Sequence, residues 1–184
     1  KTLFNMEYIF GYPIWEFKKS SNFDREKITQ EIYTIQDCDT EDKTKLINSS
    51  RGGYQSNHYK TWRIVEGDDQ YPLTLAYIRS HLESPKGLKF PHTIESCWSN
   101  INKEGDYNVP HHHGSEDTLA GVLFVTDAPG LHLINPRLAS PFSDEKRSPE
   151  GNAGDIILFP KCILHWVEPS KSKEDRITVA FNIE

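Results

Sequence analysis

The sequence has few cysteines and no long apolar run. Its three cysteines, Cys38, Cys97 and Cys162, are odd in number and show no CxxC spacing. This pattern argues against a disulfide framework and favours a reducing compartment, so we expect a cytoplasmic protein. The longest uncharged apolar runs, such as residues 119–125 and 156–159, have the length of a strand and are too short to cross a membrane.

The sequence also lacks an excess of basic residues. It has 21 Lys and Arg against 27 Asp and Glu, which gives a net charge of −6. A protein whose main affinity is for nucleic acid carries a basic surface, so we expect neither a nucleic acid nor a membrane partner. No basic and apolar leader stands ahead of Phe4, and we expect no secretory signal. A length of 184 residues without internal repeats predicts one domain and leaves a homodimer open.

The first 90 residues combine strand and helix patterns. Aromatic and β-branched residues favour a strand, whereas apolar residues repeating every three or four positions favour a helix packed on a sheet. The expected elements are an edge strand broken by a turn over residues 8–17, a helix from a cap at Asn22 or Asp24 to Gln36, a loop over residues 37–50, a tight double-glycine turn over residues 51–56, and a helix over residues 71–82 that ends at residues 84–87.

From residue 90 onward the pattern changes to short strands separated by Gly, Pro, Asn and Asp. The predicted strands cover residues 93–102, 107–112, 118–126, 130–134, 155–159, 163–167 and 175–183. Several short strands with no helical pattern between them indicate a barrel or a two-sheet jelly roll. A charged, proline-flanked excursion over residues 141–151 is a candidate lid.

Two histidines stand close together near the start of this β region, in the stretch YNVPHHH. In a strand, residues i and i+2 point to the same face, so His111 and His113 can converge on one ion while His112 points away. The alternative is a polar strand end with solvated histidines, because a histidine-rich tract is only a compositional hint.

A third histidine and an arginine follow much later in the chain. His165 comes after a strand, a proline-marked turn and a returning strand, which would place it in the mouth of a barrel. The alternative for His165 is a core histidine that bonds a backbone carbonyl. Arg176 and Thr178 share one strand face, and an inward-pointing arginine is costly unless it meets an anion. A guanidinium matches a carboxylate through two parallel hydrogen bonds; the alternative is a surface salt bridge with Glu174 or Asp175.

Together these residues resemble the Fe(II)- and 2-oxoglutarate-dependent oxygenase superfamily, whose motif is His-x-acid, a distant His and an Arg-x-Ser/Thr. The chain is more closely similar to a prolyl-hydroxylase-like subfamily that is abundant in marine bacteria and their phages. The matching segments are residues 10–14, 52–56, 97–102, 105–108, 110–113, 121–125, 135–137, 154–160, 165–169 and 176–182.

The resemblance implies a mainly β fold with flanking helices. Its core would be a double-stranded β-helix (jelly roll, cupin-like) over residues 91–184, and residues 1–90 would supply a strand and two helices packed on one sheet. The implied iron ligands are His111, His113 and His165, and the implied contacts to 2-oxoglutarate are Arg176, Thr178, Asn100 and Asn182. The strand alternation also puts Asn102 on the pocket face with Asn100.

This sequence departs from the superfamily motif at one position. His113 stands where the family has a carboxylate, and Glu116 or Asp117, just past Gly114, stays open as the third iron ligand. The activity implied is an oxygenase reaction that consumes O2 and 2-oxoglutarate and hydroxylates a small molecule or peptide, releasing succinate and CO2. Overall similarity favours peptidyl proline as the substrate.

Other functions are compatible with parts of the pattern. A three-histidine, cupin-type metal enzyme that does not use 2-oxoglutarate, or a zinc hydrolase, would explain the histidines. Neither would give Arg176 and Thr178 a role. A non-enzymatic jelly-roll module that binds carbohydrate would explain the strands but not the histidine spacing.

Overall fold

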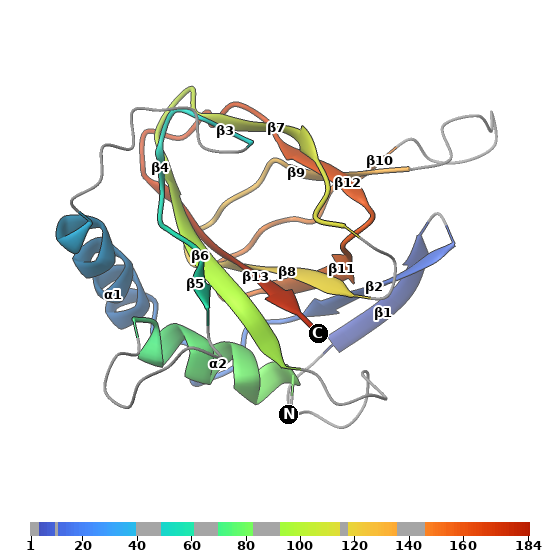
Figure 1. Ribbon diagram of the computed structural model, residues 1–184, viewed down its shortest axis with the longest axis horizontal. Helices are drawn as coiled ribbons and strands as arrows, with labels where there is room; N and C mark the ends of the chain where they lie inside the picture. Colours follow the sequence, from blue (N-terminus) through green and yellow to red (C-terminus); the bar gives the residue numbers. More distant parts are fainter. Residues whose placement is uncertain are drawn as a thin grey trace.

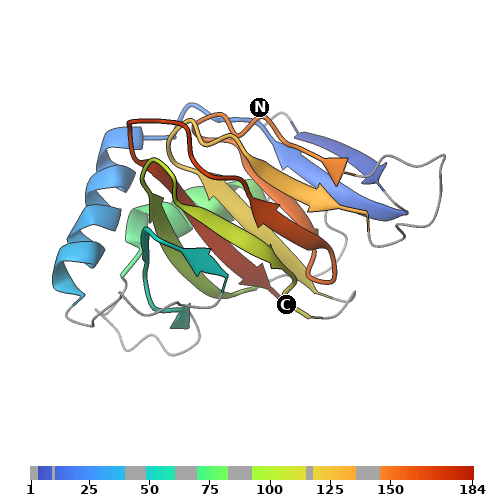
Figure 2. The ribbon, with the colours of Figure 1, turned by 90° about the horizontal axis from the view of Figure 1, so that it is seen from above.

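The structure is a computed structural model that describes residues 4–9, 11–39, 49–60, 70–82, 93–114, 118–135 and 146–184. Two antiparallel β-sheets face each other, and two helices lie against the outer side of the larger sheet (Figures 1 and 2). This is the expected mainly β, jelly-roll arrangement. Neither helix among the described residues is long and apolar enough to cross a membrane.

The larger sheet has eight strands. Its order is β1 (Phe4–Ile9), β2 (Tyr12–Phe17), β11 (Ile156–Pro160), β8 (Leu119–Phe124), β13 (Arg176–Ile183), β6 (Ile94–Asn102) and β4 (Tyr54–Gln55), with β5 (Tyr59–Lys60) also paired to β6. The smaller sheet has the order β10 (Lys146–Arg147), β9 (Leu131–Ile134), β12 (Leu164–Val167), β7 (Tyr107–His111) and β3 (Ser50–Arg51).

The strand predictions are confirmed. All seven strands expected after residue 90 are present, with ends within two residues of the predicted ones. The edge strand of residues 8–17 is a hairpin that turns at Gly11, whose φ of 85° explains the glycine. Four two-residue strands, β3, β4, β5 and β10, were not predicted. Strands this short have no periodicity to read in a sequence.

Both predicted helices are present, as α1 (Arg25–Cys38) and α2 (Pro72–Leu82). Asp24 is the N-cap of α1, where its side chain accepts from the Lys27 N–H. The first turn of α2 is capped from outside, because Glu31 of α1 accepts from the backbone N–H groups of Leu73 and Thr74. The loop after α1 and the turn after α2 fall largely on residues 40–48 and 83–92, outside the described residues.

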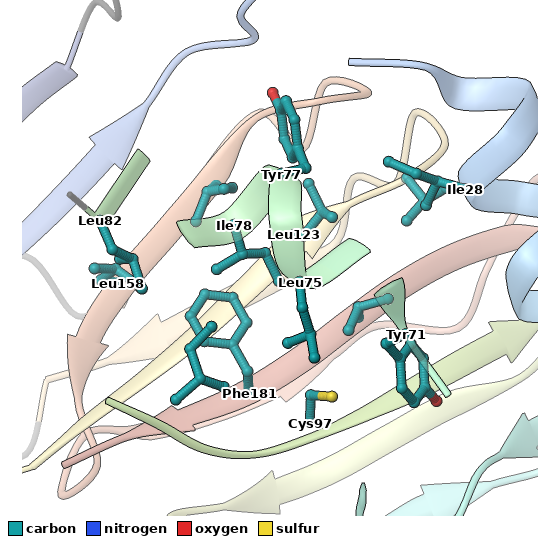
Figure 3. Packing of buried hydrophobic residues seen from close by; sticks show 14 of the residues in the cluster. Ile28, Tyr71, Leu75, Tyr77, Ile78, Leu82, Cys97, Leu123, Leu158 and Phe181 are labelled. Carbon is teal, nitrogen blue, oxygen red and sulfur yellow. The ribbon is translucent and has the colours of Figure 1, made fainter. Parts of the chain in front are cut away.

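Helix α2 supplies much of the core outside the larger sheet. Leu75, Ile78 and Leu82 are buried on one helix face, as their spacing predicts. They point toward Leu123, Leu158 and Phe181 of the sheet (Figure 3). A second apolar cluster, which includes Phe124, Leu133 and Phe159, lies between the two sheets. The larger sheet is therefore buried on both faces.

The prediction of a lid over residues 141–151 is wrong for residues 146–151, the part of this segment that the structure describes. Strand β10 pairs with β9 of the smaller sheet. From it, the Arg147 guanidinium donates to Glu7 and Glu16 of β1 and β2, each at 2.9 Å. Residues 146–151 are thus tied to both sheets, because an ion-pair network joins the two edges. Residues 141–145 lie outside the described residues.

A test of this packing is available at Gly121 of β8. A Cβ atom there would lie 2.3 Å from Phe181 Cζ and 2.6 Å from Leu158 Cδ2, both in the core under α2. We expect Gly121→Ala to lower the free energy of unfolding in urea by about 1–3 kcal/mol, because overpacking displaces neighbouring side chains.

The second variant for a double-mutant cycle with Gly121→Ala is Phe181→Leu, which removes the ring atoms that the added Cβ would contact. The double variant should be more stable than the sum of the two single effects predicts. Additive effects, or a Gly121→Ala protein with wild-type stability, would contradict this account of the core.

Candidate metal and cosubstrate site

The pairing of β7 with β12 brings the three predicted histidines together. His111 and His165 are direct partners across the two strands, which lie side by side in Figure 1. His113 follows β7 and is fixed by a hydrogen bond of 2.9 Å from its N–H to Lys161 O. One ring nitrogen from each of the three histidines falls within 4.8 Å of the others. The structure therefore makes one cluster of residues that are far apart in sequence.

Backbone carbonyls fix the orientation of two of these rings. His111 Nδ1 donates to Val109 O at 2.8 Å, and His165 Nδ1 donates to Ile163 O at 2.9 Å. A carbonyl can only accept, so each Nδ1 carries the proton and each Nε2 keeps an unprotonated lone pair. The carbonyl-bonded core histidine considered for His165 is thus present, and it also orients that ring for metal binding.

The ring nitrogens are close enough for a common ion. His113 Nε2 and His165 Nε2 are 3.2 Å apart. Two imidazole nitrogens bound at right angles to one ion at ~2.1 Å lie about 3 Å apart, so the observed spacing fits a shared metal. Phe159 packs its ring edge against His165, with centroids 5.0 Å apart, and limits the rotation of that ligand.

Burial keeps these histidines neutral. Desolvation lowers the pKa of His113 to about 4 and that of His165 to about 3, and it also lowers the pKa of His111. An imidazole must be unprotonated to bind a metal. At neutral pH the cluster is therefore ready to accept a cation without first losing protons.

The histidines line a cavity of about 460 Å³ between the two sheets. The opposite wall comes from the larger sheet, where Asn100, Arg176 and Thr178 all reach the cavity. Thr178 lies directly opposite Asn100 in the pairing of β13 with β6. The cavity is of the size that binds small ligands.

Among the described wall residues Arg176 alone has a fixed positive charge, and it is only 4% exposed. Its Nε and Nη2 groups donate to Pro129 O and Ala128 O, each at 3.2 Å. Burial lowers its pKa to about 10, so it stays charged at neutral pH. No described carboxylate forms a salt bridge with it, and Asp175 instead accepts from Tyr33 at 2.7 Å. The surface ion pair considered from the sequence is therefore excluded for Asp175, and the cavity holds an arginine that lacks an anion.

The other residues predicted at the site do not line the cavity or lie outside the described residues. Asn182 is not among the cavity residues, and its Nδ2 donates to Ser96 Oγ at 3.2 Å. Asn102 does not reach the cavity either, because it lies beneath the turn at Gly53. Glu116 and Asp117 lie outside the described residues.

Three cavity residues from the N-terminal half were not predicted: Ser49, Gln55 and His58. Ser49 Oγ lies 3.3 Å from His111 Nε2 and accepts from Asn108 Nδ2 at 3.3 Å. These residues sit on or beside the two-residue strands β3, β4 and β5, for which the sequence carries no periodic signal. The double-glycine turn was the only hint that this segment folds back on the β core.

Sequence comparison supports the reading of the site. Residues 96–182 match the family described as "Putative 2OG-Fe(II) oxygenase". The match covers a little under half of the chain, and over it the chain is similar to the 2OG-Fe(II) oxygenase superfamily. The matched region holds the three histidines together with Arg176 and Thr178. A sequence search of curated proteins finds no match to this chain.

Solved structures show the same fold. HygX from Streptomyces hygroscopicus, with nickel and 2-oxoglutarate bound, has a TM-score of 0.61 at 10% identity and covers 92% of this chain and 81% of that chain. A Pseudomonas putida prolyl-4-hydroxylase has a TM-score of 0.58 at 14% identity and covers 97% and 91%. A Burkholderia pseudomallei oxidoreductase of the 2OG-Fe(II) oxygenase family has a TM-score of 0.58 at 12% identity and covers 93% and 84%. This chain spans about half of the epimerase SnoN, 47% of that chain.

The three desolvated histidines predict how the metal-free protein responds to acid. Their pKa values are lowered on folding, so the unfolded chain binds protons near pH 6.5 that the folded chain does not bind until about pH 4 or below. Stability should therefore be full above pH 6.5 and fall as the pH drops toward 4. Urea unfolding between pH 7.5 and about 4.5 measures this loss.

His113→Gln should reduce the loss, whereas His112→Gln, at an exposed position, should leave it unchanged. A pH dependence that is identical in both variants would contradict the assignment of the effect to the buried cluster.

Proposed function

We propose that the protein is an Fe(II)- and 2-oxoglutarate-dependent dioxygenase that hydroxylates its substrate and releases succinate and CO2. In this proposal His111, His113 and His165 hold the iron, while Arg176 and Thr178 bind the distal carboxylate of 2-oxoglutarate. The observation that carries the proposal is the buried Arg176, which has no carboxylate partner among the described residues and lies in the same cavity as the three convergent histidines. A dicarboxylate that binds the metal at one end and Arg176 at the other explains why the histidines and the arginine line the same cavity.

The donor set fits the iron. Three neutral imidazole nitrogens on one side of an ion leave its remaining positions free for 2-oxoglutarate and O2. Bound iron and 2-oxoglutarate supply the oxidising chemistry, and the chain supplies placement and a dry cavity. Val109 O and Ile163 O hold the protons of His111 and His165 at Nδ1, so both ligands present Nε2.

The remaining cavity residues bind the cosubstrate or exclude water. Two of the five N–H donors of Arg176 are held by the carbonyls of Ala128 and Pro129, which fixes the guanidinium plane for a bidentate contact. Thr178 can donate a further hydrogen bond, and Asn100 beside it offers an amide to the same ligand. Phe159 and Trp98 keep water from the histidines.

We propose a peptide with a proline as the substrate. The full-length likeness in fold to the P. putida prolyl-4-hydroxylase supports this choice, as does the similarity of the sequence motifs. Single-domain organisation over residues 1–184, a cytoplasmic location and the absence of nucleic acid and membrane partners remain predictions, and a homodimer stays open.

A cupin-type enzyme without a keto acid is the second candidate, because it shares the three histidines. It leaves Arg176 buried with no anion, which is energetically costly. A carbohydrate-binding module is less favoured still, because the three convergent histidines would have no role in it.

The main test measures cosubstrate binding. Wild-type protein with Fe(II) under anaerobic conditions should develop a visible metal-to-ligand charge-transfer band on titration with 2-oxoglutarate. Arg176→Ala should raise the Kd for 2-oxoglutarate by roughly a hundredfold, because two charge-assisted hydrogen bonds are lost. Arg176→Lys should recover only part of the affinity, since an ammonium cannot form the bidentate contact.

Iron affinity, measured separately, is the control for folding and should be unchanged in both variants. Wild-type 2-oxoglutarate affinity in Arg176→Ala would contradict the assignment and favour the enzyme without a keto acid.

A second test asks which residue is the third iron ligand. We predict that His113→Ala loses iron, measured by equilibrium dialysis, whereas Glu116→Ala and Asp117→Ala retain it. A neutral third ligand leaves the site one unit more positive than the usual two-histidine, one-carboxylate set, which strengthens the binding of the dianionic cosubstrate and weakens the binding of iron. Loss of iron in either carboxylate variant, with retention in His113→Ala, would overturn the three-histidine site.

A further inference from the structure

The cavity has a wall that lies outside the part of the chain matched to the oxygenase family. Ser49, Gln55 and His58 line the cavity but precede the matched residues 96–182. The matched region already supplies the histidines and Arg176. A wall added by another segment is where a single oxygenase can differ from its relatives in the substrate it accepts.

This wall is held rigidly against β6. Ser56 N–H donates to Ser99 O at 3.0 Å, and Ser99 N–H donates back to Ser56 Oγ at 3.0 Å. Tyr71, fully buried, bonds both hydroxyls, with its OH 2.8 Å from Ser56 Oγ and 3.0 Å from Ser99 Oγ. On the other side of His58, Tyr59 pairs with Cys97 in the sheet. The segment that carries Gln55 and His58 is therefore fixed on both sides.

His58 extends the aromatic surface of the cavity toward solvent. Its ring is stacked on Trp98 at 4.1 Å between centroids and 13° between planes, and Trp98 lies 5.6 Å from the ring of His113. Trp98 is buried, whereas His58 is exposed. The stack thus leads from the cavity mouth to a proposed iron ligand and offers a flat surface to a planar group.

Gln55 completes a polar row across three strands. It pairs with Asn100, which pairs with Thr178, and all three line the cavity. Directly opposite residues in a sheet have neighbouring side chains on the same face. Gln55 is 5% exposed, and within the described residues no hydrogen bond to its side-chain amide is found. A buried amide favours a ligand with both a donor and an acceptor.

The charge of the cavity restricts the ligand further. Among its described lining residues there is no Asp, Glu or Lys, and Arg176 carries the fixed charge. A cationic substrate would lose its hydration without gaining a counter-charge, which is strongly unfavourable. An uncharged planar group with a donor and an acceptor, as in a peptide bond, meets the flat stack and the amide together.

We infer that Gln55 and His58 select the substrate, and that it is an uncharged peptide segment whose amide plane lies on the His58–Trp98 stack and bonds Gln55. This inference rests on the proposed function, because it assumes that the cosubstrate occupies the Arg176 end of the cavity.

The experiment uses full-length protein loaded with Fe(II) and 2-oxoglutarate. Three pools of capped pentapeptides share a central proline and have flanking residues that are uncharged, acidic or lysine. Oxygen is then admitted, and succinate and the gain of one oxygen atom in the peptides are measured. Wild-type protein should prefer the uncharged pool over the lysine pool by about tenfold or more. A preference of about tenfold corresponds to the free-energy cost of leaving one buried polar group without a partner.

Three variants and one control make the test specific. Gln55→Ala and His58→Ala should lower kcat/KM for the uncharged pool by roughly tenfold and leave the 2-oxoglutarate charge-transfer band unchanged. Gln55→Glu keeps the shape and adds a carboxylate, so it should shift the preference toward the lysine pool. Asn57→Ala, a neighbouring exposed residue that does not line the cavity, should behave as wild type.

Each other outcome counts against the inference. A wild-type preference for lysine, an unchanged preference in Gln55→Glu, or wild-type kcat/KM in both alanine variants would overturn it. If the band forms but no pool is oxidised, the peptide assignment fails while the proposed cosubstrate chemistry stands. Absence of the band in wild-type protein would instead refute the proposed function.

Discussion

The site depends on the antiparallel pairing of β7 with β12. Through this register His165 lies directly opposite His111, and the turn after β7 brings His113 to the same point. The backbone also supplies the carbonyls that fix the proton of two rings at Nδ1. A shift of one residue in either strand would turn a histidine to the other face of the sheet. Strand register and metal site are thus a single structural feature.

The larger sheet supplies the second requirement, a buried cation without a carboxylate partner. Arg176 begins β13, a strand in the interior of that sheet, where both faces are covered. The carbonyls of Ala128 and Pro129 hold the guanidinium but cannot neutralise it. The fold therefore maintains a positive charge in a poorly solvated cavity, and the anion proposed to bind there would neutralise it. The two sheets bring the histidine cluster and Arg176 to opposite walls of one cavity.

The N-terminal half does more than support the barrel. Helix α2 covers the outer face of the larger sheet, and the Tyr71 hydroxyl beside its first turn ties Ser56 to Ser99. The same network positions the segment with Gln55 and His58 over the cavity. The stability of the core and the shape of the cavity wall that Gln55 and His58 form are consequently linked, because both depend on how α2 packs on the larger sheet.

The sequence by itself determined the seven long strands, both helices and the three histidines with Arg176, because each is encoded by short-range periodicity or residue chemistry. It could not determine the two-residue strands β3, β4, β5 and β10, which exist only through pairing with distant strands. For the same reason Gln55 and His58 were not predicted, Asn102 proved to lie beneath the turn at Gly53, and Lys146–Arg147 proved to be an edge strand held by the ion pairs of Arg147. Only the tertiary structure decided these points, because each depends on contacts between residues that are distant along the chain.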